Sequence, residues 1–254
     1  MGKVISIVNQ KGGVGKTTTA INLSAALALN DKKALLIDFD PQSNTTSGLG
    51  IDYKKIQKSI YHVLLGEVPG KEIILKTDID NLFLIPSNID LTAAEIELLR
   101  ENEKEYKFKK AIEELKKEYD YILVDCPPSL GMLTINALTA SQSVMIPIQC
   151  EYYALEGIAD LMTTIKLTKR GINPELEVQG IVLTMFDSRT NFSEQVAAEV
   201  EKFFGNAVYK TRIPRNIRTA EAPSHGVPVI RYDRLSKGSR AYLHLAVEFL
   251  KREE

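Results

Sequence analysis

Short apolar runs alternate along this chain with longer segments whose apolar residues recur at helical spacing. The apolar runs are rich in β-branched and aliphatic residues and cover residues 4–8, 34–37, 121–124, 143–146, 178–183 and 207–209. Strands that are apolar at every position are typical of a parallel sheet that is covered on both faces. The pattern therefore predicts six strands of such a sheet.

The segments between these runs predict amphipathic helices. Residues 17–29 carry apolar side chains at helical spacing, and Thr92-Ala93-Ala94-Glu95 has the form of a capping box that opens another helix. Residues 193–204 repeat the pattern, with an apolar face made of Val196, Val200, Phe203 and Phe204. Strands that alternate with helices predict an α/β fold, a doubly wound and mostly parallel sheet with helices on both faces. Its ligand should lie at the carboxyl ends of the strands.

Composition supports a globular protein in a reducing compartment. The chain has 254 residues, of which 44% are apolar and 26% charged, and no Gly/Ser/Pro-rich linker divides it. We therefore expect a single domain over residues 1–254. Cys126 and Cys150 are too few for a disulfide framework, and no stretch approaches the roughly 18 apolar residues of a membrane helix. Since the first residues also lack the apolar core of a signal peptide, we expect a cytoplasmic protein.

The strongest local motif follows the first apolar run and reads QKGGVGKTTT over residues 10–19. Three glycines let the backbone curl around a phosphate, Lys16 supplies a mobile positive charge, and the next helix offers its N-terminus to the anion. Thr17 would then bind Mg²⁺ through its hydroxyl group. The alternative is a glycine-rich turn with a chance lysine. The general P-loop pattern has glycine where this chain has Gln10, so the motif is a variant with a second lysine, Lys11.

Three aspartates lie at or just past the ends of apolar runs. Asp38, Asp40 and Asp125 should therefore reach the sheet edge where the glycine-rich loop also lies. Carboxylates at that edge can hold Mg²⁺ or orient a water molecule, because a hard cation prefers oxygen ligands. The alternative is that each aspartate caps a turn.

The formal net charge of −1 hides a strong asymmetry along the chain. Residues 1–207 carry a net charge of −6, whereas residues 208–254 carry ten basic and five acidic side chains. Such asymmetry indicates a surface for a polyanion, on which Arg and Lys hold phosphates without reading base sequence. A solvated basic surface without a partner is the alternative.

Several motifs together resemble one family, the deviant Walker A ATPases. Its loop has the form KGGxGKT, and residues 38–44 (DFDPQSN) and 125–129 (DCPPS) resemble its second motif and the end of its Walker B strand. Within that family, the chain resembles the Soj/ParA chromosome-partitioning ATPases, and this similarity covers about residues 3–250. The segments that carry the closer resemblance are 149–157, 213–216 and 221–226. The main departure is Ser43, where many relatives have glycine.

The resemblance implies a weak ATPase that uses ATP and Mg²⁺. Lys16 would bind the phosphates, Lys11 would cross a homodimer interface to reach the nucleotide of the partner subunit, and Asp40 would position the attacking water. Asp125 would contact Mg²⁺ through water, with Asp38 behind the direct ligands. The adenine would lie near residues 212–214. The expected nucleotide-binding residues are Lys11, Gly12, Gly13, Val14, Gly15, Lys16, Thr17, Thr18, Met185 and Pro214.

The same resemblance implies partners for the basic segment. Members of this family bind double-stranded DNA without sequence preference as ATP dimers, and a ParB/Spo0J-type centromere-binding protein stimulates their hydrolysis. We therefore expect a nucleoid-associated protein with no membrane attachment. Arg189 and Arg218 lie in segments that resemble family motifs, and the resemblance implies that both bind DNA. Arg215, Arg234, Lys237 and Arg240 are further candidates on the basis of their charge alone.

Two other functions remain open. A MinD-like membrane-associated cell-division ATPase shares the loop and the aspartates, but it would need a basic amphipathic tail. The apolar stripe in residues 241–251 is interpreted as packing on the domain, because its polar face lacks a dense basic cluster. A metabolic enzyme or iron–sulfur reductase is disfavoured, since the chain has neither paired cluster cysteines nor a second substrate motif.

Overall fold

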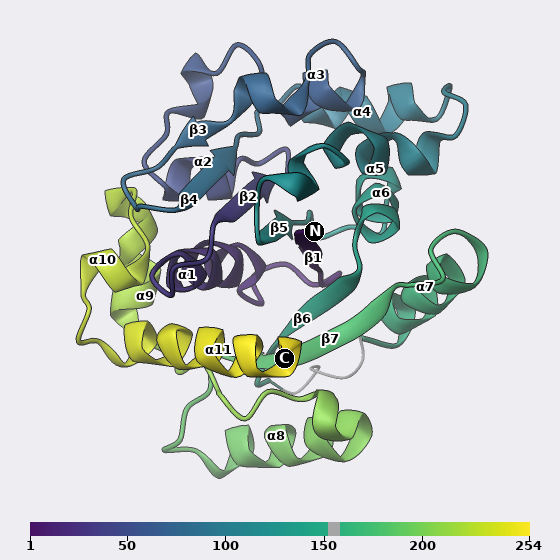
Figure 1. The fold of residues 1–254 in the computed structure, drawn as a ribbon. Helices are drawn as coiled ribbons and strands as arrows, with labels where there is room; N and C mark the ends of the chain where they lie inside the picture. The colour runs from purple at the N-terminus through teal and green to yellow at the C-terminus, as the bar shows by residue number, and fades with distance from the viewer. Residues whose placement is uncertain (152–157) are drawn as a thin grey trace.

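The computed structural model describes residues 1–151 and 158–254. Within this part of the chain, seven strands form one sheet in the order β3-β4-β2-β5-β1-β6-β7, and all neighbours are parallel except β3 and β4. The doubly wound, mostly parallel sheet predicted from the sequence is thus confirmed (Figure 1). The strands are β1 (Lys3–Ile7), β2 (Ala34–Asp38), β3 (Leu75–Lys76), β4 (Leu82–Ile85), β5 (Tyr121–Asp125), β6 (Ser143–Gln149) and β7 (Glu177–Thr184).

Helices cover both faces of the sheet, which explains why the strands are apolar at every position. On β2, Leu35 and Ile37 pack into a core with α3 to α8, whereas Leu36 points into a second core with α1, α10 and α11. The helices are α1 (Lys16–Ala28), α2 (Asn44–Gly48), α3 (Ile60–Leu64), α4 (Leu91–Leu98), α5 (Lys107–Ile112), α6 (Met132–Ala140), α7 (Ile158–Gly171), α8 (Asn191–Phe204), α9 (Ile217–Glu221), α10 (Val229–Tyr232) and α11 (Lys237–Glu253). Short 3₁₀ turns lie at Tyr53–Lys55, Gly70–Ile73, Lys104–Tyr106, Leu115–Lys117, Gly205–Ala207 and Ala222–His225.

Three local predictions are wrong. Residues 207–209 form a single bridge, between Val208 and Ile181, rather than a strand, because a 3₁₀ turn brings the chain only briefly to the edge of β7. The expected capping box is absent from the described structure of α4, since this helix already begins at Leu91 and its N-cap, Asp90, makes no capping hydrogen bond. Phe203 is 72% exposed, so the buried face of α8 is Val196, Ala197 and Val200.

The C-terminal helix lies along the sheet beside α1 (Figure 1). Its fully buried side chains include Tyr242, Leu245 and Phe249, whereas Val247 is 43% exposed, so the buried stripe is rotated slightly from the sequence expectation. Lys3 of β1 pairs with Glu253 at 2.8 Å, which joins the two ends of the described chain. Among the described helices, we find none with the length and apolarity needed to cross a membrane.

Candidate nucleotide site

The glycine-rich loop joins the end of β1 to the start of α1. Gly13 and Gly15 have φ angles of 77° and 90°, which only glycine adopts without strain. A Cβ atom at Gly12 or Gly13 would meet nothing within 4 Å, so the surface of the loop is open at these positions. Lys16 is the first residue of the thirteen-residue helix α1. The loop therefore curls in front of a helix N-terminus, where a phosphate group is favoured.

Two side chains at strand ends hold this loop in place. Asn9 follows β1, and its amide donates to the carbonyl of Pro147 in β6 at 2.7 Å while its oxygen accepts from the backbone of Lys11 at 2.9 Å. Thr184, at the end of β7, donates to the Val14 carbonyl at 2.8 Å. Sequence reasoning missed both residues. Asn9 could have been found from its position directly after a strand, but nothing local in the sequence marks Thr184.

Asp38 and Asp125 lie opposite each other because β2 and β5 pair in parallel register up to these residues. Both carboxylates are fully buried. Burial raises the pKa of Asp125 to about 6, and the hydrogen bond from the Thr45 hydroxyl opposes the shift. Burial and then the Asp125 charge raise the pKa of Asp38 to about 8. Asp125 thus ionises first, and its charge opposes the ionisation of Asp38.

Two threonines of α2 bind these carboxylates and were not identified from the sequence. Thr45 donates its hydroxyl to Asp125 Oδ2 at 2.7 Å. Thr46 donates its hydroxyl and its backbone N–H to Asp38 Oδ2 at 2.6 and 2.8 Å. The other oxygen of Asp125, Oδ1, accepts no hydrogen bond from the described residues although it is buried. A buried carboxylate oxygen without a donor is suited to a cation or to a water molecule bound to one.

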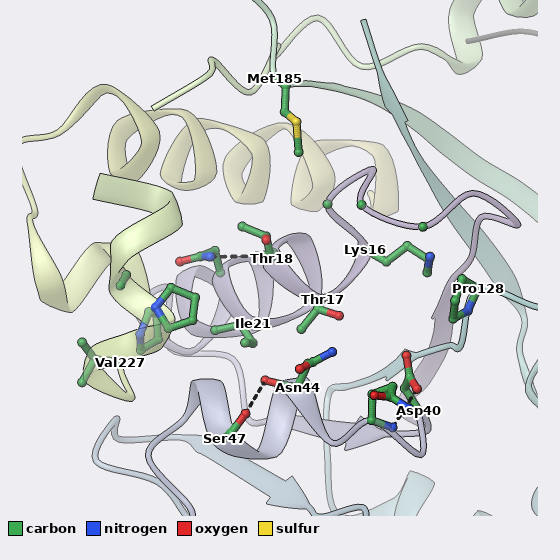
Figure 2. Close-up of a pocket in the computed structure, with 18 residues that line it drawn as sticks. Lys16, Thr17, Thr18, Ile21, Asp40, Asn44, Ser47, Pro128, Met185 and Val227 are labelled. Atoms are coloured by element: carbon green, nitrogen blue, oxygen red, sulfur yellow. Dashed lines mark hydrogen bonds between the residues drawn. The ribbon is translucent and has the colours of Figure 1, made fainter. Parts of the chain in front are cut away.

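Lys16 and Asp40 lie on opposite sides of a cleft of about 420 Å³ at this edge of the sheet. Figure 2 shows Lys16 and Thr17 on the α1 side, with Asp40 and Asn44 facing them. Burial lowers the pKa of Lys16, and the carboxylates of Asp125 and Asp40 oppose this shift. The Lys16 ammonium donates to the Lys11 carbonyl at 3.0 Å. The cleft lining also includes Gly12, Gly13, Gly15, Thr18, Met185, Ala222, Pro223, Val227 and Pro228.

A second hollow of about 210 Å³ adjoins the cleft and shares Gly15, Thr18 and Met185 with it. Its wall contains Pro214, together with Ile213, Asn216, Thr219 and Tyr242. Arg212 lies outside both linings, because its guanidinium group pairs with Glu194 and Glu201 of α8 at 2.8 and 3.0 Å. An apolar slot beside a phosphate cleft has the shape and chemistry that a purine base requires.

Lys11 forms an ion pair outside the cleft instead of lining it. Its ammonium group forms an ion pair with Glu151, just after β6, and both side chains are partly exposed. Neither Lys11 nor Val14 lines the cleft, and Val14 is buried beneath the loop. Residues 152–157 of the motif at 149–157 lie outside the described residues.

The expected DNA-binding residues fall into two regions. Arg189 is on the loop before α8 and pairs with Asp187 at 2.7 Å, which holds the pKa of Asp187 well below its usual range. The others belong to what we call the basic surface, formed by the exposed residues Arg215, Arg218, Arg231, Arg234, Lys237 and Arg240 around α9, α10 and the start of α11. Within it, Arg218 contacts Glu221 at 3.0 Å and Asp233 at 3.5 Å. Lys237 and Arg240 also line a shallow hollow of about 460 Å³ with Lys210, Arg212 and His244.

Known proteins identify the family of this chain. A family model described as an AAA domain matches residues 2–178. The chain is 54% identical over 248 residues to the sporulation initiation inhibitor protein Soj of Bacillus subtilis, covering 98% of both chains. It is 51% identical over 253 residues to the chromosome partitioning protein ParA of Myxococcus xanthus, covering 100% of this chain and 89% of that relative. The chain belongs to the Soj/ParA family.

Solved structures show the same fold around bound nucleotide. Cobyrinic acid a,c-diamide synthase of Mycobacterium smegmatis was solved with ADP and magnesium and with an ATP analogue and magnesium. These structures are 38% and 37% identical to this Soj/ParA chain, with TM-scores of 0.89 and 0.88, and each alignment covers 100% of this chain and 96% of the solved one.

The position of Ser43 explains the departure from the Soj/ParA motif. Ser43 has φ 55° and ψ 32°, in the left-handed region that glycine adopts at little cost. The turn has this conformation because the Ser43 backbone N–H donates to the Asp40 carbonyl at 2.9 Å while Asp40 Oδ1 accepts from the Gln42 backbone at 2.9 Å. Ser43 therefore holds a turn conformation that glycine would adopt with less backbone strain.

Among residues 1–151 and 158–254, no three His, Cys, Asp or Glu side chains are grouped so as to hold a metal ion by themselves. The hydroxyl of Thr17, which lines the cleft, and the oxygens of a bound phosphate are ligands of the kind that Mg²⁺ prefers.

Proposed function

We propose that this chain, as one ATPase unit over residues 1–254, is an ATP-dependent switch for DNA segregation. The observation that carries the proposal is the cleft in which Lys16 and Thr17 face Asp40 across the carboxyl end of the sheet. Soj/ParA relatives are chromosome-partitioning proteins, and the proposal assigns this chain the same role.

ATP and Mg²⁺ are the cofactors of the site. The open glycine-rich loop and Lys16 bind the phosphates, and the adjoining apolar slot with Met185 and Pro214 takes the base. The Thr17 hydroxyl would hold Mg²⁺, and Asp125 would bind water around the ion, because its buried Oδ1 accepts no hydrogen bond from the described residues. When bound, Mg²⁺ neutralises negative charge on the phosphates.

The protein's own residues divide the work of hydrolysis. Lys16 places a positive charge beside the phosphates, and Asp40 orients the attacking water from the opposite side of the cleft. Asp38 holds Thr46, and so the start of α2, behind the metal site. Such positioning without a strong base is consistent with slow hydrolysis that a ParB/Spo0J-type partner accelerates.

Lys11 is assigned to the partner subunit's nucleotide in an ATP-bound homodimer. Its partial exposure leaves it accessible to a second copy, and its ion pair with Glu151 must open before it can reach another site. A cation supplied across the interface makes the nucleotide part of the contact between subunits, so loss of the γ-phosphate loosens the dimer. We expect Lys11→Ala to bind ATP and remain monomeric in sedimentation experiments. ATP-dependent dimerisation of the variant at the level of the parent would refute this role.

Double-stranded DNA is the proposed partner of the basic surface. Its six cations are gathered around α9, α10 and the start of α11, and a dimer doubles the phosphate contacts that one protomer can make. The Arg189 side chain is 85% exposed on a separate loop and extends the proposed contact. The protein would then be cytoplasmic and held on the nucleoid while ATP is bound.

Two measurements test the DNA-binding role. Arg218→Ala should weaken binding of the ATP form to a random duplex and reduce the dependence of binding on salt, because each lost phosphate contact lowers the salt slope by about one. Lys109→Ala, on the opposite side of the sheet in α5, is the control and should leave both quantities unchanged. Equal binding by Arg218→Ala and the parent would remove Arg218 from the interface.

A metabolic function remains the second candidate because of one comparison. The solved structure with TM-score 0.89 is a cobyrinic acid a,c-diamide synthase, an enzyme with a small-molecule substrate. Product analysis distinguishes the two functions. ATP-dependent modification of a small carboxylic acid by this chain would favour the enzyme, whereas ATP-dependent DNA binding favours the switch.

A further inference from the structure

Two aliphatic side chains project from the basic surface. Ile217 and Leu235 are each 75% exposed, although both are large and apolar. Ile217 is the first residue of α9, and Leu235 directly precedes Ser236, the N-cap of α11. Scattered exposed apolar residues are common on protein surfaces, but these two come from different segments and share a cationic surrounding.

Tight packing brings the two segments together. Gly238, in the first turn of α11, has no room for a side chain, because a Cβ atom there would lie 2.0 Å from the Thr219 hydroxyl of α9. The same position is 3.4 Å from the Asn216 side chain, which caps α9. Arg218 bridges the same segments through its contact with Asp233. The starts of α9 and α11 therefore lie against each other, as Figure 1 also shows.

Capping hydrogen bonds hold both aliphatic residues in fixed positions. Asn216 accepts from the Thr219 backbone at 3.2 Å, and Ser236 accepts from the Ser239 backbone at 3.1 Å. Asp233 accepts from the backbone of Leu235 itself at 3.2 Å. Because the backbone is already ordered here, a ligand that contacts these side chains loses little binding energy to ordering them.

We propose that Ile217 and Leu235 enter a groove of duplex DNA between the phosphates held by the basic surface. The inference rests on the proposed DNA binding and adds an apolar contribution to it. Exposed cations flank each aliphatic residue along the chain, Arg215 and Arg218 around Ile217 and Arg234 and Lys237 around Leu235. Phosphates held by these cations would leave the sugar and base edges of the groove to the apolar side chains. This part of the affinity does not release counterions, so it does not depend on salt.

The composition of the surface favours DNA over an anionic membrane. A helix that lies in a membrane interface presents a long apolar face, whereas this surface offers two aliphatic side chains.

The test compares DNA binding by the full chain with ATP over a series of salt concentrations. The double variant Ile217→Ser/Leu235→Ser should bind a random duplex about tenfold more weakly at every salt concentration, with the salt slope of the parent. The control Ile96→Ser/Leu167→Ser changes residues that are 62% and 64% exposed on α4 and α7, and it should bind as the parent does. Arg234→Gln, at an exposed cation outside the base slot, should instead reduce the salt slope by about one.

Each other outcome contradicts a specific step. Parent-like affinity in the double variant overturns the inference while leaving DNA binding intact. Absence of DNA binding by the parent with ATP overturns the proposed function and this inference together. A double variant that binds DNA normally but loses parent-like binding to phosphatidylglycerol vesicles would assign the two side chains to a membrane instead.

Discussion

The buried carboxylate of Asp38 makes the stability of the nucleotide-free protein depend on pH in a predictable way. Both hydrogen bonds from Thr46 end on one oxygen, Oδ2, at 2.6 and 2.8 Å. An asparagine can present its side-chain oxygen to the same two donors but never acquires a charge. The substitution Asp38→Asn therefore removes the titration of this group while keeping its main contacts.

The magnitude follows from the shift in pKa, from 3.8 to about 8. Between these values the folded protein holds a proton that the unfolded chain has released, so the free energy of unfolding falls as the pH rises. One pKa unit corresponds to about 1.4 kcal/mol, so the parent loses up to about 3 kcal/mol through Asp38 between about pH 5.5 and pH 8. The variant lacks this loss, and its advantage over the parent should grow by that amount.

The new side-chain amide nitrogen in the Asp38→Asn variant would face the backbone N–H of Asp40, which in the parent donates to Asp38 Oδ1 at 3.3 Å. This mismatch lowers stability by about 1 kcal/mol, and equally at every pH, so the test is the pH dependence of the difference. Urea unfolding of both proteins without nucleotide, at several pH values, measures it. Asp52→Asn, in an exposed turn, is the control and should parallel the parent. A difference between Asp38→Asn and the parent that stays constant across this range would refute the reasoning.

Three further substitutions test other contacts of the site. Thr45→Val removes the hydroxyl bound to buried Asp125, and we expect a loss of about 1–3 kcal/mol in the free energy of unfolding. Glu151→Gln releases Lys11 and should tighten ATP-dependent dimerisation by up to about fivefold in sedimentation equilibrium, since an exposed ion pair contributes up to about 1 kcal/mol. Ser43→Gly relieves the left-handed backbone and should raise the free energy of unfolding by about 1 kcal/mol in urea.

Matched variants separate these effects from the chemistry of the substitution itself. Thr163→Val removes an exposed hydroxyl that donates to a carbonyl of its own helix, so it should change stability by less than about 0.5 kcal/mol. Glu175→Gln neutralises an exposed glutamate before β7 and should leave dimerisation unchanged. The assigned role of Thr45 is contradicted if Thr45→Val is as stable as the parent. That of Glu151 is contradicted if Glu151→Gln dimerises no more tightly, and that of Ser43 if Ser43→Gly is less stable.

Local pattern was sufficient to predict most of the sheet. Five of the predicted strands are present in the structure. Continuous apolar runs such as residues 34–37 are favoured in a strand that is buried on both faces of a sheet. Strand β3 has two residues and β4 has four, and such short segments carry too little pattern to distinguish them from a loop. The 207–209 run is apolar for another reason, since Tyr209 is buried against Gly180 rather than paired along a strand.

The site was predicted where its residues are adjacent in sequence and missed where they meet only in the fold. The loop around Lys16 is a contiguous motif, and position after a strand identified the aspartates. Register between β2 and β5 sets Asp38 opposite Asp125, but it depends on pairing that no local pattern specifies. Thr45 joins Asp125 across 80 positions in the chain and Thr184 joins Val14 across 170, so neither contact has a local signal.

The most direct test of the account is the affinity for a random DNA duplex measured at one fixed salt concentration with ATP, with ADP and without nucleotide. We expect strong binding only with ATP, because the proposed ATP dimer would present two basic surfaces at once. The Asp40→Ala variant should remain bound to DNA in the presence of ATP, because hydrolysis would no longer lead to dissociation of the proposed dimer. Equal affinity in all three nucleotide states would contradict the claim that ATP switches DNA binding.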